Sequence, residues 1–359
     1  MKRILAILVL VCLLCGCTGQ QAETAPTTQT TVPATTEPTT EPTTVPTTEA
    51  TVPPTTEPPM LYTNPLTGLP CEEPVTKRPV AVVTNNSSSA MPQHGTSQAE
   101  ILVEILSEGG ITRNLAIYTD IASVPALGAI RSARTYFQSL SKAFNAILVH
   151  SGDSIYANEQ FRTGKYPHVD GMFTTIFYRD QARKNAGYLT EHTLFVKGQA
   201  LAEYVAGVFP MDTDRQDYGL KFDPQFQMTG EPAQTVRIAF FANGKVSQLS
   251  YDSQLGSYSL YQHKQDYIDG NTGEKVFFKN VLVLYADMRT VETTHVFHTL
   301  LGQNVGYYAC GGKFQPILWN RAAEEQSFTF TYGDGTPVTM APGTTYIAVV
   351  HRNSVVTFE

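Results

Sequence analysis

The sequence predicts an α+β protein with a layered strand–helix (α/β) part at residues 60–209 and a β-rich part at residues 210–359. Between residues 78 and 150, short β-branched runs alternate with helical runs, which is typical of layered strand–helix folds. From residue 236 onward, the pattern changes to short strands separated by turn residues. About 300 residues follow the linker, which is enough for two domains. We therefore expect two domains behind a leader and a linker.

Residues 1–16 have the pattern of a bacterial lipoprotein signal peptide. Lys2 and Arg3 precede an apolar run, residues 4–14, that is too short to span a bilayer. Gly16 and Cys17 complete a lipobox-like sequence, which predicts cleavage after Gly16 and attachment of diacylglycerol and palmitate to Cys17. A plain secretory signal cleaved near Ala22 is the alternative. The favoured interpretation places the protein on the extracytoplasmic face of the cell membrane, held by lipid.

Residues 17–59 are expected to form a disordered linker. The stretch from Ala22 to Pro59 is dominated by Thr, Pro, Glu, Val and Ala, and no apolar residue recurs at a core-forming period. At about 3.1 Å per residue, a proline-stiffened chain of this length spans on the order of 100 Å. The linker would thus lift a domain off the membrane into a cell wall. Its composition suits O-glycosylation but does not establish it.

The net charge of the chain limits the classes of partner that it can be expected to bind. The formal net charge is −7; it becomes −9 without Lys2 and Arg3, and −4 once the five linker glutamates are also left out. This mild acidity argues against nucleic acid or anionic lipid as the main partner.

Two cysteines, Cys71 and Cys310, lie in the part after the linker. An even number of cysteines in an exported protein is compatible with a disulfide. Two free thiols are the alternative, and the sequence does not decide between them.

The expected elements of the first part are strands and helices in alternation. We expect strands at 78–84, 111–119, 129–130 and 146–150, and helices at 101–106, 132–144 and 199–208. The helix at 101–106 follows from a capping-box pattern at Ser97–Glu100 and from the Gly109-Gly110 pair that would end it. In the second part, we expect largely antiparallel strands at 236–241, 245–251, 257–262, 276–285 and 344–350, with Trp319 in a core or an interface.

A candidate site begins with two carboxylates that are followed by an arginine. Glu104 and Glu108 are four residues apart, which places them on one face of the expected helix. Arg113 follows on the next expected strand. This spacing predicts that all three side chains belong to one site.

Two further arginines, Arg131 and Arg134, bracket Ser132 at an expected strand-to-helix transition, where Ser132 would cap the helix. Free amide groups at a helix N-terminus beside arginines bind phosphate, pyrophosphate or carboxylate. The sequence therefore predicts an anion site. The alternative is a structural network in which the arginines pair with Asp120 or the two glutamates.

Later residues extend this candidate site. His150 ends a buried strand, where α/β folds place ligands, although a structural histidine is the alternative. The spacing around Ser151 is not Gly-x-Ser-x-Gly. Arg179, Asp180 and Arg183 would form a lid or second wall of the anion pocket, or a solvated charged turn.

No cofactor or metal is expected from the sequence. His295 and His298 are three apart in a run that reads as a strand, so they face opposite sides, and no cysteine or carboxylate cluster completes a site. P-loop, dinucleotide and HExxH motifs do not occur.

Several stretches together resemble the YerB-like lipoprotein family, DUF3048. They are residues 64–68 (NPLTG), 108–113 (EGGITR), 128–134 (GAIRSAR), 149–154 (VHSGDS) and 177–180 (FYRD). The resemblance implies an α/β part followed by a β-rich part, on a membrane lipoprotein. It implies no established activity, so it assigns no catalytic residue.

Two functions fit these observations. The first is a non-catalytic module that binds an anionic or glycan cell-envelope ligand, or a protein partner, through the surface of Arg113, Arg131 and Arg134. The second is an enzyme acting on phosphate- or pyrophosphate-linked cell-wall precursors in an arginine-lined pocket. The first is favoured because the sequence contains no complete catalytic set. The expected partners are the membrane, through the lipid on Cys17, and a wall polymer or envelope protein, with no nucleic acid.

Overall fold

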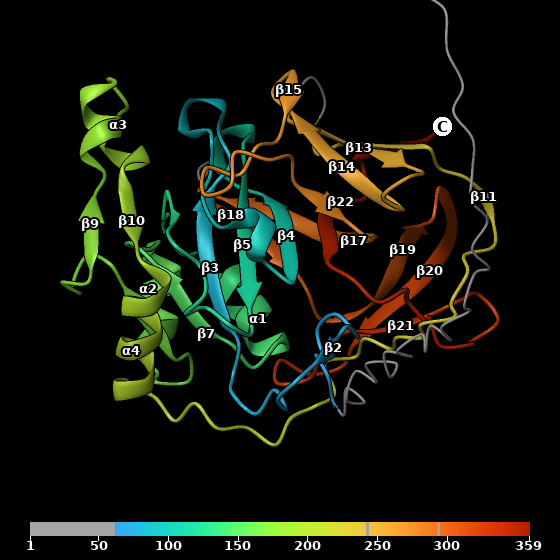
Figure 1. Ribbon diagram of the computed structural model, residues 1–359, viewed down its shortest axis with the longest axis horizontal. Helices are drawn as coiled ribbons and strands as arrows, with labels where there is room; N and C mark the ends of the chain where they lie inside the picture. Colours follow the sequence, from blue (N-terminus) through green and yellow to red (C-terminus); the bar gives the residue numbers. More distant parts are fainter. Residues whose placement is uncertain (1–61, 242–243, 293–294) are drawn as a thin grey trace, which may run out of the picture. The chain divides into compact units, whose positions relative to one another are not determined.

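A twelve-stranded mixed sheet runs through the centre of the fold (Figure 1). The computed structural model describes residues 62–241, 244–292 and 295–359. The strands of this sheet are β3 (Val80–Asn85), β4 (Ile101–Leu106), β5 (Thr112–Tyr118), β7 (Ile147–His150), β8 (His168–Asp170), β11 (Glu231–Pro232), β17 (Asn280–Val291), β18 (His295–Thr299), β19 (Gly302–Cys310), β20 (Lys313–Arg321), β21 (Thr329–Thr331) and β22 (Thr345–His351). Their order is β11-β20-β19-β17-β22-β4-β5-β3-β7-β8, with β18 beside β17 and β21 beside β20.

Smaller sheets and short helices complete the fold. A six-stranded sheet contains β12 (Thr235–Ala239), β13 (Val246–Asp252), β14 (Ser257–Gln262), β15 (Gln265–Asp266), β16 (Phe277–Phe278) and β23 (Val355–Phe358). A three-stranded sheet contains β6 (Leu127–Gly128), β9 (Phe177–Arg179) and β10 (Leu194–Val196), and a hairpin-like pair contains β1 (Tyr62–Thr63) and β2 (Pro70–Cys71). The helices are α1 (Thr135–Ala143), α2 (Ile155–Phe161), α3 (Gln181–Asn185) and α4 (Gly198–Val208), with 3-10 turns η1 (Ser88–Ala90), η2 (Thr96–Gln98), η3 (Glu108–Gly110) and η4 (Thr190–His192).

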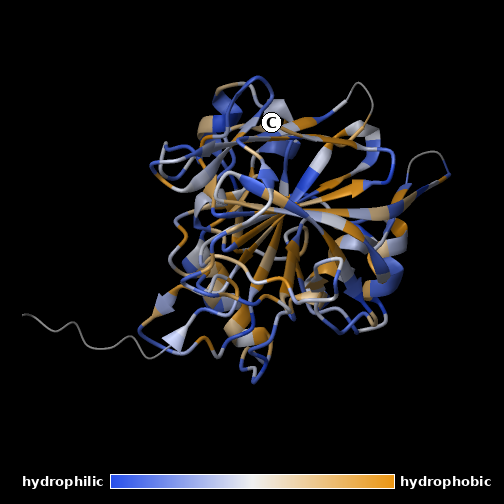
Figure 2. Ribbon diagram, turned by 90° about the vertical axis from the view of Figure 1, so that its right-hand side faces the viewer, coloured by the Kyte–Doolittle hydropathy of each residue, from blue (hydrophilic) through white to orange (hydrophobic). Residues whose placement is uncertain are grey.

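The central strands are buried on both faces. Every residue of β3, β4, β5 and β7 is buried, and most of their residues are apolar, as expected for strands covered on both sides. Successive residues alternate between two cores: Ile101 and Val103 face the core that contains α1 and α2, whereas Leu102 faces the core that contains α4 and the six-stranded sheet. Figure 2 shows the hydrophobic residues along the interior strands and hydrophilic ones in the surrounding loops.

One edge of this sheet gathers the ends of several strands. β3, β7 and β8 run parallel, so their C-terminal ends share an edge. β5 is antiparallel to β3, with Arg113 opposite Asn85, which brings the β4–β5 turn to the same edge. We call this edge the carboxyl edge. In open α/β sheets this is where ligands bind.

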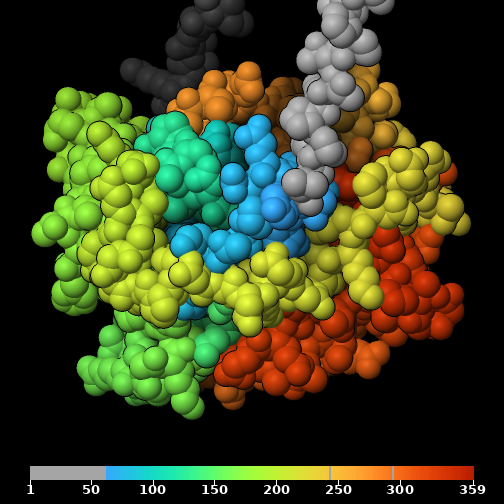
Figure 3. All heavy atoms as spheres, turned by 60° about the horizontal axis from the view of Figure 1, so that its bottom comes forward, coloured from blue at the N-terminus to red at the C-terminus, as the bar shows by residue number. Residues whose placement is uncertain are grey.

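The predicted fold class, a strand–helix part followed by a β-rich part, is confirmed. The two parts share one sheet, because β22 pairs in parallel with β4. The described residues from 62 to 359 belong to one compact unit. The segment that follows α4, yellow in Figure 3, crosses the face of the molecule between the blue residues of the N-terminal part and the green and red residues below them.

The expected helix at 101–106 is wrong: these residues form β4. The capping-box pattern before it forms a 3-10 turn instead, and Glu100 accepts a hydrogen bond from the Thr119 amide across the sheet (3.2 Å). The β-branched residues Ile101, Val103 and Ile105 explain the outcome, because a short, fully apolar run has no periodicity that separates a helix from a buried strand.

One other expectation needs correction. Ser132 does not cap α1, because the helix begins at Thr135 with Arg134 at its N-cap position. Of the two alternatives that the sequence left open for Cys71 and Cys310, the structure has the free thiols. Cys310 is buried in the α1 core at the end of β19, whereas Cys71 is half-buried in the separate β1–β2 pair.

The predicted signal peptide (1–16), lipidated Cys17 and linker (17–59) lie outside the described residues. Among the residues that the structure describes, no helix is long and apolar enough to cross a membrane.

Candidate functional site

Three arginines lie at the carboxyl edge, and two of them contact Glu108. The Arg134 Nε donates to Glu108 Oε1 (2.6 Å), and an Arg113 terminal nitrogen lies 3.9 Å from Glu108 Oε2. Arg113 also donates to the Ser132 carbonyl (2.8 Å). Arg131 donates to the Glu191 carbonyl (3.2 Å) and lies 3.9 Å from its carboxylate. We call Glu108, Arg113, Arg131, Ser132 and Arg134 the arginine edge; the sequence prediction that these residues belong to one place agrees with this arrangement.

The electrostatics of the arginine edge follow from its burial and its charges. The pKa of Arg113 falls to about 10, because burial and then the charge of Arg134 oppose its protonation. The pKa of Glu108 falls to about 2: burial acts in the opposite direction, but hydrogen bonding and charge from Arg134 outweigh it. Three guanidinium groups thus face the two carboxylates of Glu108 and Glu191. The Arg113 Nε is buried without a hydrogen-bond partner among the described residues, which leaves a donor free.

Glu104 lies elsewhere, on the opposite face of the sheet. Its fully buried carboxylate accepts hydrogen bonds from five side chains, at 2.5 to 3.0 Å: Asn86, Thr112, Ser247, Gln262 and Tyr346. The ammonium of Lys245 lies 3.8 Å from it, and burial lowers the pKa of Lys245 to about 8. We call Glu104, Lys245 and these five residues the buried network. The expectation that Glu104 and Glu108 share a helix face fails because residues 101–106 form the strand β4, whereas Glu108 lies beyond that strand, in the turn η3.

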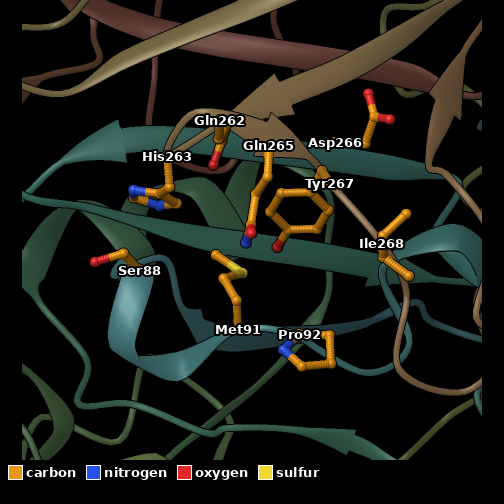
Figure 4. Close-up of a pocket in the computed structure, with 9 residues that line it drawn as sticks. All are labelled: Ser88, Met91, Pro92, Gln262, His263, Gln265, Asp266, Tyr267 and Ile268. Carbon is orange, nitrogen blue, oxygen red and sulfur yellow. The ribbon is translucent and has the colours of Figure 1, made fainter. Parts of the chain in front are cut away.

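A pocket of about 540 Å³ adjoins the buried network (Figure 4). Gln262 belongs to both, since it lines the pocket and donates to Glu104 Oε2 (2.6 Å). Figure 4 shows Gln265, Tyr267 and Met91 converging at its centre. A second hollow of about 350 Å³ shares Ser88 and Met91 with the first. The two hollows therefore adjoin on either side of η1.

The charged turn at 179–183 has a structural role. It belongs to residues 177–196, which we call the arm, and which contain β9, α3, η4 and β10. Arg179 donates to the Thr190 carbonyl (2.6 Å), and Asp180 caps α3 by accepting from the Arg183 amide (3.0 Å). Arg183 is buried and donates to the carbonyls of Ala90 (2.9 Å), His192 (3.2 Å) and Pro92. Arg183 thus holds the arm onto the η1 loop, whereas the hydrogen bonds of Arg179 and Asp180 stay within the arm.

We expect Arg183→Ala to loosen the arm. The guanidinium also lies 4.7 and 5.0 Å from the ring centres of Phe195 and Tyr188, so the change removes packing as well as hydrogen bonds. Buried carbonyls left without donors cost about 2–3 kcal/mol. Urea unfolding and proteolysis of the arm measure the effect. Lys184→Ala, at an exposed neighbour, is the control; equal proteolysis of the two variants would contradict this role.

His150 is satisfied by its neighbours. Its Nδ1 lies 2.8 Å from the Gly152 carbonyl and its Nε2 lies 2.8 Å from His168 Nδ1. Ligand atoms of His150, Asp153 and Asp170 lie within 4.8 Å of one another, which is a spacing that could hold a metal ion. Asp170 already accepts from the amides of Gly152 (2.9 Å) and Met172 (2.8 Å).

Sequence reasoning missed the partners of Glu104 and the pocket beside them. Lys245 and Gln262 were expected only as members of strands, and Met91 and Tyr267 were not singled out. A local signal existed for a partner: Glu104 is a carboxylate in an otherwise apolar run, and a buried carboxylate needs a cationic partner. Nothing in the sequence around Glu104 names Lys245 as that partner.

The fold and the site define an α+β protein with a two-sided central sheet and a cationic edge at the ends of its parallel strands. A family model described as the N-terminal domain of DUF3048, a protein of unknown function, matches residues 66–208, and the model of the C-terminal domain matches residues 236–347. The chain belongs to the DUF3048 family.

Two comparisons extend this assignment. YerB of Bacillus subtilis (strain 168), which is named as a lipoprotein, is 32% identical over 235 residues, covering 64% of this chain and 68% of YerB. The crystal structure of the Bacillus subtilis YerB protein matches with a TM-score of 0.71 at 28% identity, over 82% of this chain and 99% of that one. This similarity supports a lipoprotein of an uncharacterised family and points to membrane anchoring.

Proposed function

We propose that this protein is a non-catalytic module, anchored on the extracytoplasmic face of the membrane through Cys17, that binds an anionic or glycan ligand of the cell envelope at the carboxyl edge. The observation that carries the proposal is the position of Arg131. It contacts Glu191, and the next residue, His192, lines the hollow that adjoins the larger pocket at Ser88 and Met91. A cationic group thus lies beside a residue that lines the smaller of two neighbouring hollows.

This arrangement suits an extended, polar ligand. Hydroxyl and amide groups line the hollows, including Ser88, Ser89 and Gln265, and they offer hydrogen bonds to sugar hydroxyls. The guanidinium groups of Arg131 and Arg134 offer charge-assisted hydrogen bonds to phosphate or carboxylate. A wall polymer that carries both kinds of group would use both parts of the surface.

The double variant Arg131→Ala plus Arg134→Ala should lose binding while it keeps its fold. The two side chains are 19% and 15% exposed, so their charges are accessible at the edge, and their loss leaves only Arg113 there. The measurement is co-sedimentation of the full chain with insoluble cell-wall fragments, with and without their phosphate-containing polymers. We expect binding at least about tenfold weaker for the double variant, equivalent to about 1.4 kcal/mol.

The control removes two cations elsewhere. Arg162→Ala plus Lys184→Ala changes exposed residues and the same net charge, and we expect parental binding. Circular dichroism monitors the fold of both double variants. Unfolding of the arginine-edge variant would assign those arginines a structural role, and the single variant Arg131→Gln then tests the charge alone. Parental binding by the folded Arg131→Ala plus Arg134→Ala protein, or, where that protein does not fold, by a folded Arg131→Gln protein, would contradict the proposal.

One observation favours the second candidate, an enzyme on pyrophosphate-linked wall precursors. The His150, Asp153 and Asp170 group adjoins the arginine edge, because the Ser151 amide donates to the Arg131 carbonyl (3.0 Å). An ion held there beside arginines would suit phosphoryl chemistry. Turnover of a lipid-linked sugar pyrophosphate that depends on added divalent metal and is lost in Asp170→Asn would favour the enzyme over the binding module.

A further inference from the structure

A cationic hollow lies at the opposite end of the central sheet from the carboxyl edge. Its volume is about 270 Å³, and four cationic side chains with one carboxylate line it: Arg78, Lys142, Lys165, Arg215 and Glu325. Arg78 precedes β3 and Lys165 precedes β8, so the hollow lies where these parallel strands begin. The arginine edge lies where the same strands end. We call this site the cationic hollow.

The two arginines of the hollow are bonded to neutral groups. Arg78 Nε donates to the Asn145 carbonyl (3.0 Å), and its two terminal nitrogens have no hydrogen-bond partner among the described residues. Arg215 donates from all three of its guanidinium nitrogens, to the carbonyls of Ala143 (2.9 Å), Asp217 (3.2 Å) and Glu325 (3.3 Å) and to the Ser327 hydroxyl. Ala143 ends α1, so Arg215 complements the negative end of that helix. Arg215 therefore contributes its charge, whereas Arg78 also contributes free donors, and neither guanidinium is in direct contact with a carboxylate among the described residues.

The two lysines of the hollow add positive charge beyond that of the arginines at the end of α1. Lys142 lies 3.5 Å from Glu325, whose side chain is 71% exposed, and its ammonium lies 5.3 Å from the centre of the Tyr166 ring. Lys165 is exposed, and its ammonium has no hydrogen-bond or ion-pair partner within the described ranges. Four cations therefore face one lining carboxylate, with the Asp217 carboxylate acting on Arg215 from outside the lining.

We infer that the cationic hollow binds a phosphate group. The excess of three positive charges among the lining side chains calls for a multiply charged anion. The free terminal nitrogens of Arg78 provide planar, paired donors, and the lysines provide point charges, which together suit phosphate oxygens. The inference is independent of the proposed function, because the arginine edge and its hollows contribute no residue to this site. Free phosphate and the phosphodiester of a wall polymer share this chemistry.

Isothermal titration calorimetry of the full chain tests the site with two probes: inorganic phosphate and a short glycerol phosphate oligomer. Lys165→Gln removes an exposed cation without a partner, so the fold should not change, and we expect about tenfold weaker binding of whichever probe binds. Lys142→Gln plus Lys165→Gln should weaken it by about a further tenfold. Lys184→Gln, an exposed lysine of α3, is the matched control and should bind as the parent does.

The outcomes separate the two sources and the two sites. Oligomer binding that is tighter than phosphate binding and is weakened in Lys165→Gln identifies a polymer as the source. Equal binding per phosphate that is likewise weakened in that variant identifies free phosphate. Retention of this binding in the Arg131→Ala plus Arg134→Ala protein keeps the hollow distinct from the arginine edge. If neither probe binds the parent, or if Lys165→Gln binds as well as Lys184→Gln, the inference is overturned.

Discussion

Replacing Glu104 with alanine should destabilise this protein more than any other single change considered. The substitution leaves the buried ammonium of Lys245 without its carboxylate and five side-chain donors without their acceptor. Removing one partner of a buried ion pair costs about 3–5 kcal/mol, because the remaining charge stays desolvated. Urea unfolding of the variant measures the loss, and failure to fold at all is its extreme.

A second change distinguishes the lost charge from the lost packing. Glu104→Leu plus Lys245→Met removes both charges and keeps apolar volume, so it should recover part of the stability that Glu104→Ala loses. Glu274→Ala removes an exposed glutamate, and we expect an effect within about 0.5 kcal/mol. A Glu104→Ala protein as stable as the Glu274→Ala protein would show that the network contributes nothing.

The buried network also marks what the sequence alone could not provide. The run at 101–106 is apolar apart from Glu104, and both a buried helix and a buried strand satisfy that pattern. Its strand pairing with β22 joins residues more than two hundred positions apart. Lys245 and Gln262 reach Glu104 from the other sheet across a layer, and no local periodicity encodes a contact between layers.

The arginine edge was more accessible to sequence reasoning. Arg113 begins a strand, whereas Arg131 and Arg134 flank the turn between a strand and a helix, so alternating elements place all three at one edge. The sequence of the charged turn at 179–183 could not distinguish between an exposed and a buried arginine. Whether Arg183 is a free cation or a buried clamp depends on the Ala90 and Pro92 carbonyls, which a distant loop supplies.

Stability should fall as the pH falls from about 6.5 to about 4, because buried histidines stay neutral in the folded protein. Burial lowers the pKa of His298 to about 4 against the backbone hydrogen bond to Leu106, and burial with the charge of His150 lowers the pKa of His168 to about 4. The unfolded chain takes up a proton at each histidine below its ordinary pKa of about 6.5, whereas the folded protein does so only near 4. The cost of His298 therefore grows through this window to about 3 kcal/mol.

Other titrating groups change the stability in the opposite direction or in a different pH range. The depressed pKa of Glu108 lowers the stability only as the pH falls below the ordinary pKa of 4.5 toward about 2. The depressed pKa of Lys245 makes the stability depend on pH only above about pH 8. The raised pKa of buried Glu100 adds stability as the pH falls, so it opposes the histidines. A comparison at His298 isolates one contribution from this sum.

His298→Gln makes that comparison, since the amide still donates to the Leu106 carbonyl that accepts from His298 Nε2 (2.8 Å) but does not titrate. The measurement is the free energy of unfolding in urea between pH 7.5 and pH 4, for parent and variant. We expect the parent to lose more stability than the variant by about 3 kcal/mol at the acid end. Nuclear magnetic resonance of the His298 ring in the parent gives its pKa directly. A midpoint near 6.5, with parallel stability curves for the two proteins, would show that His298 is free to take up its proton in the fold.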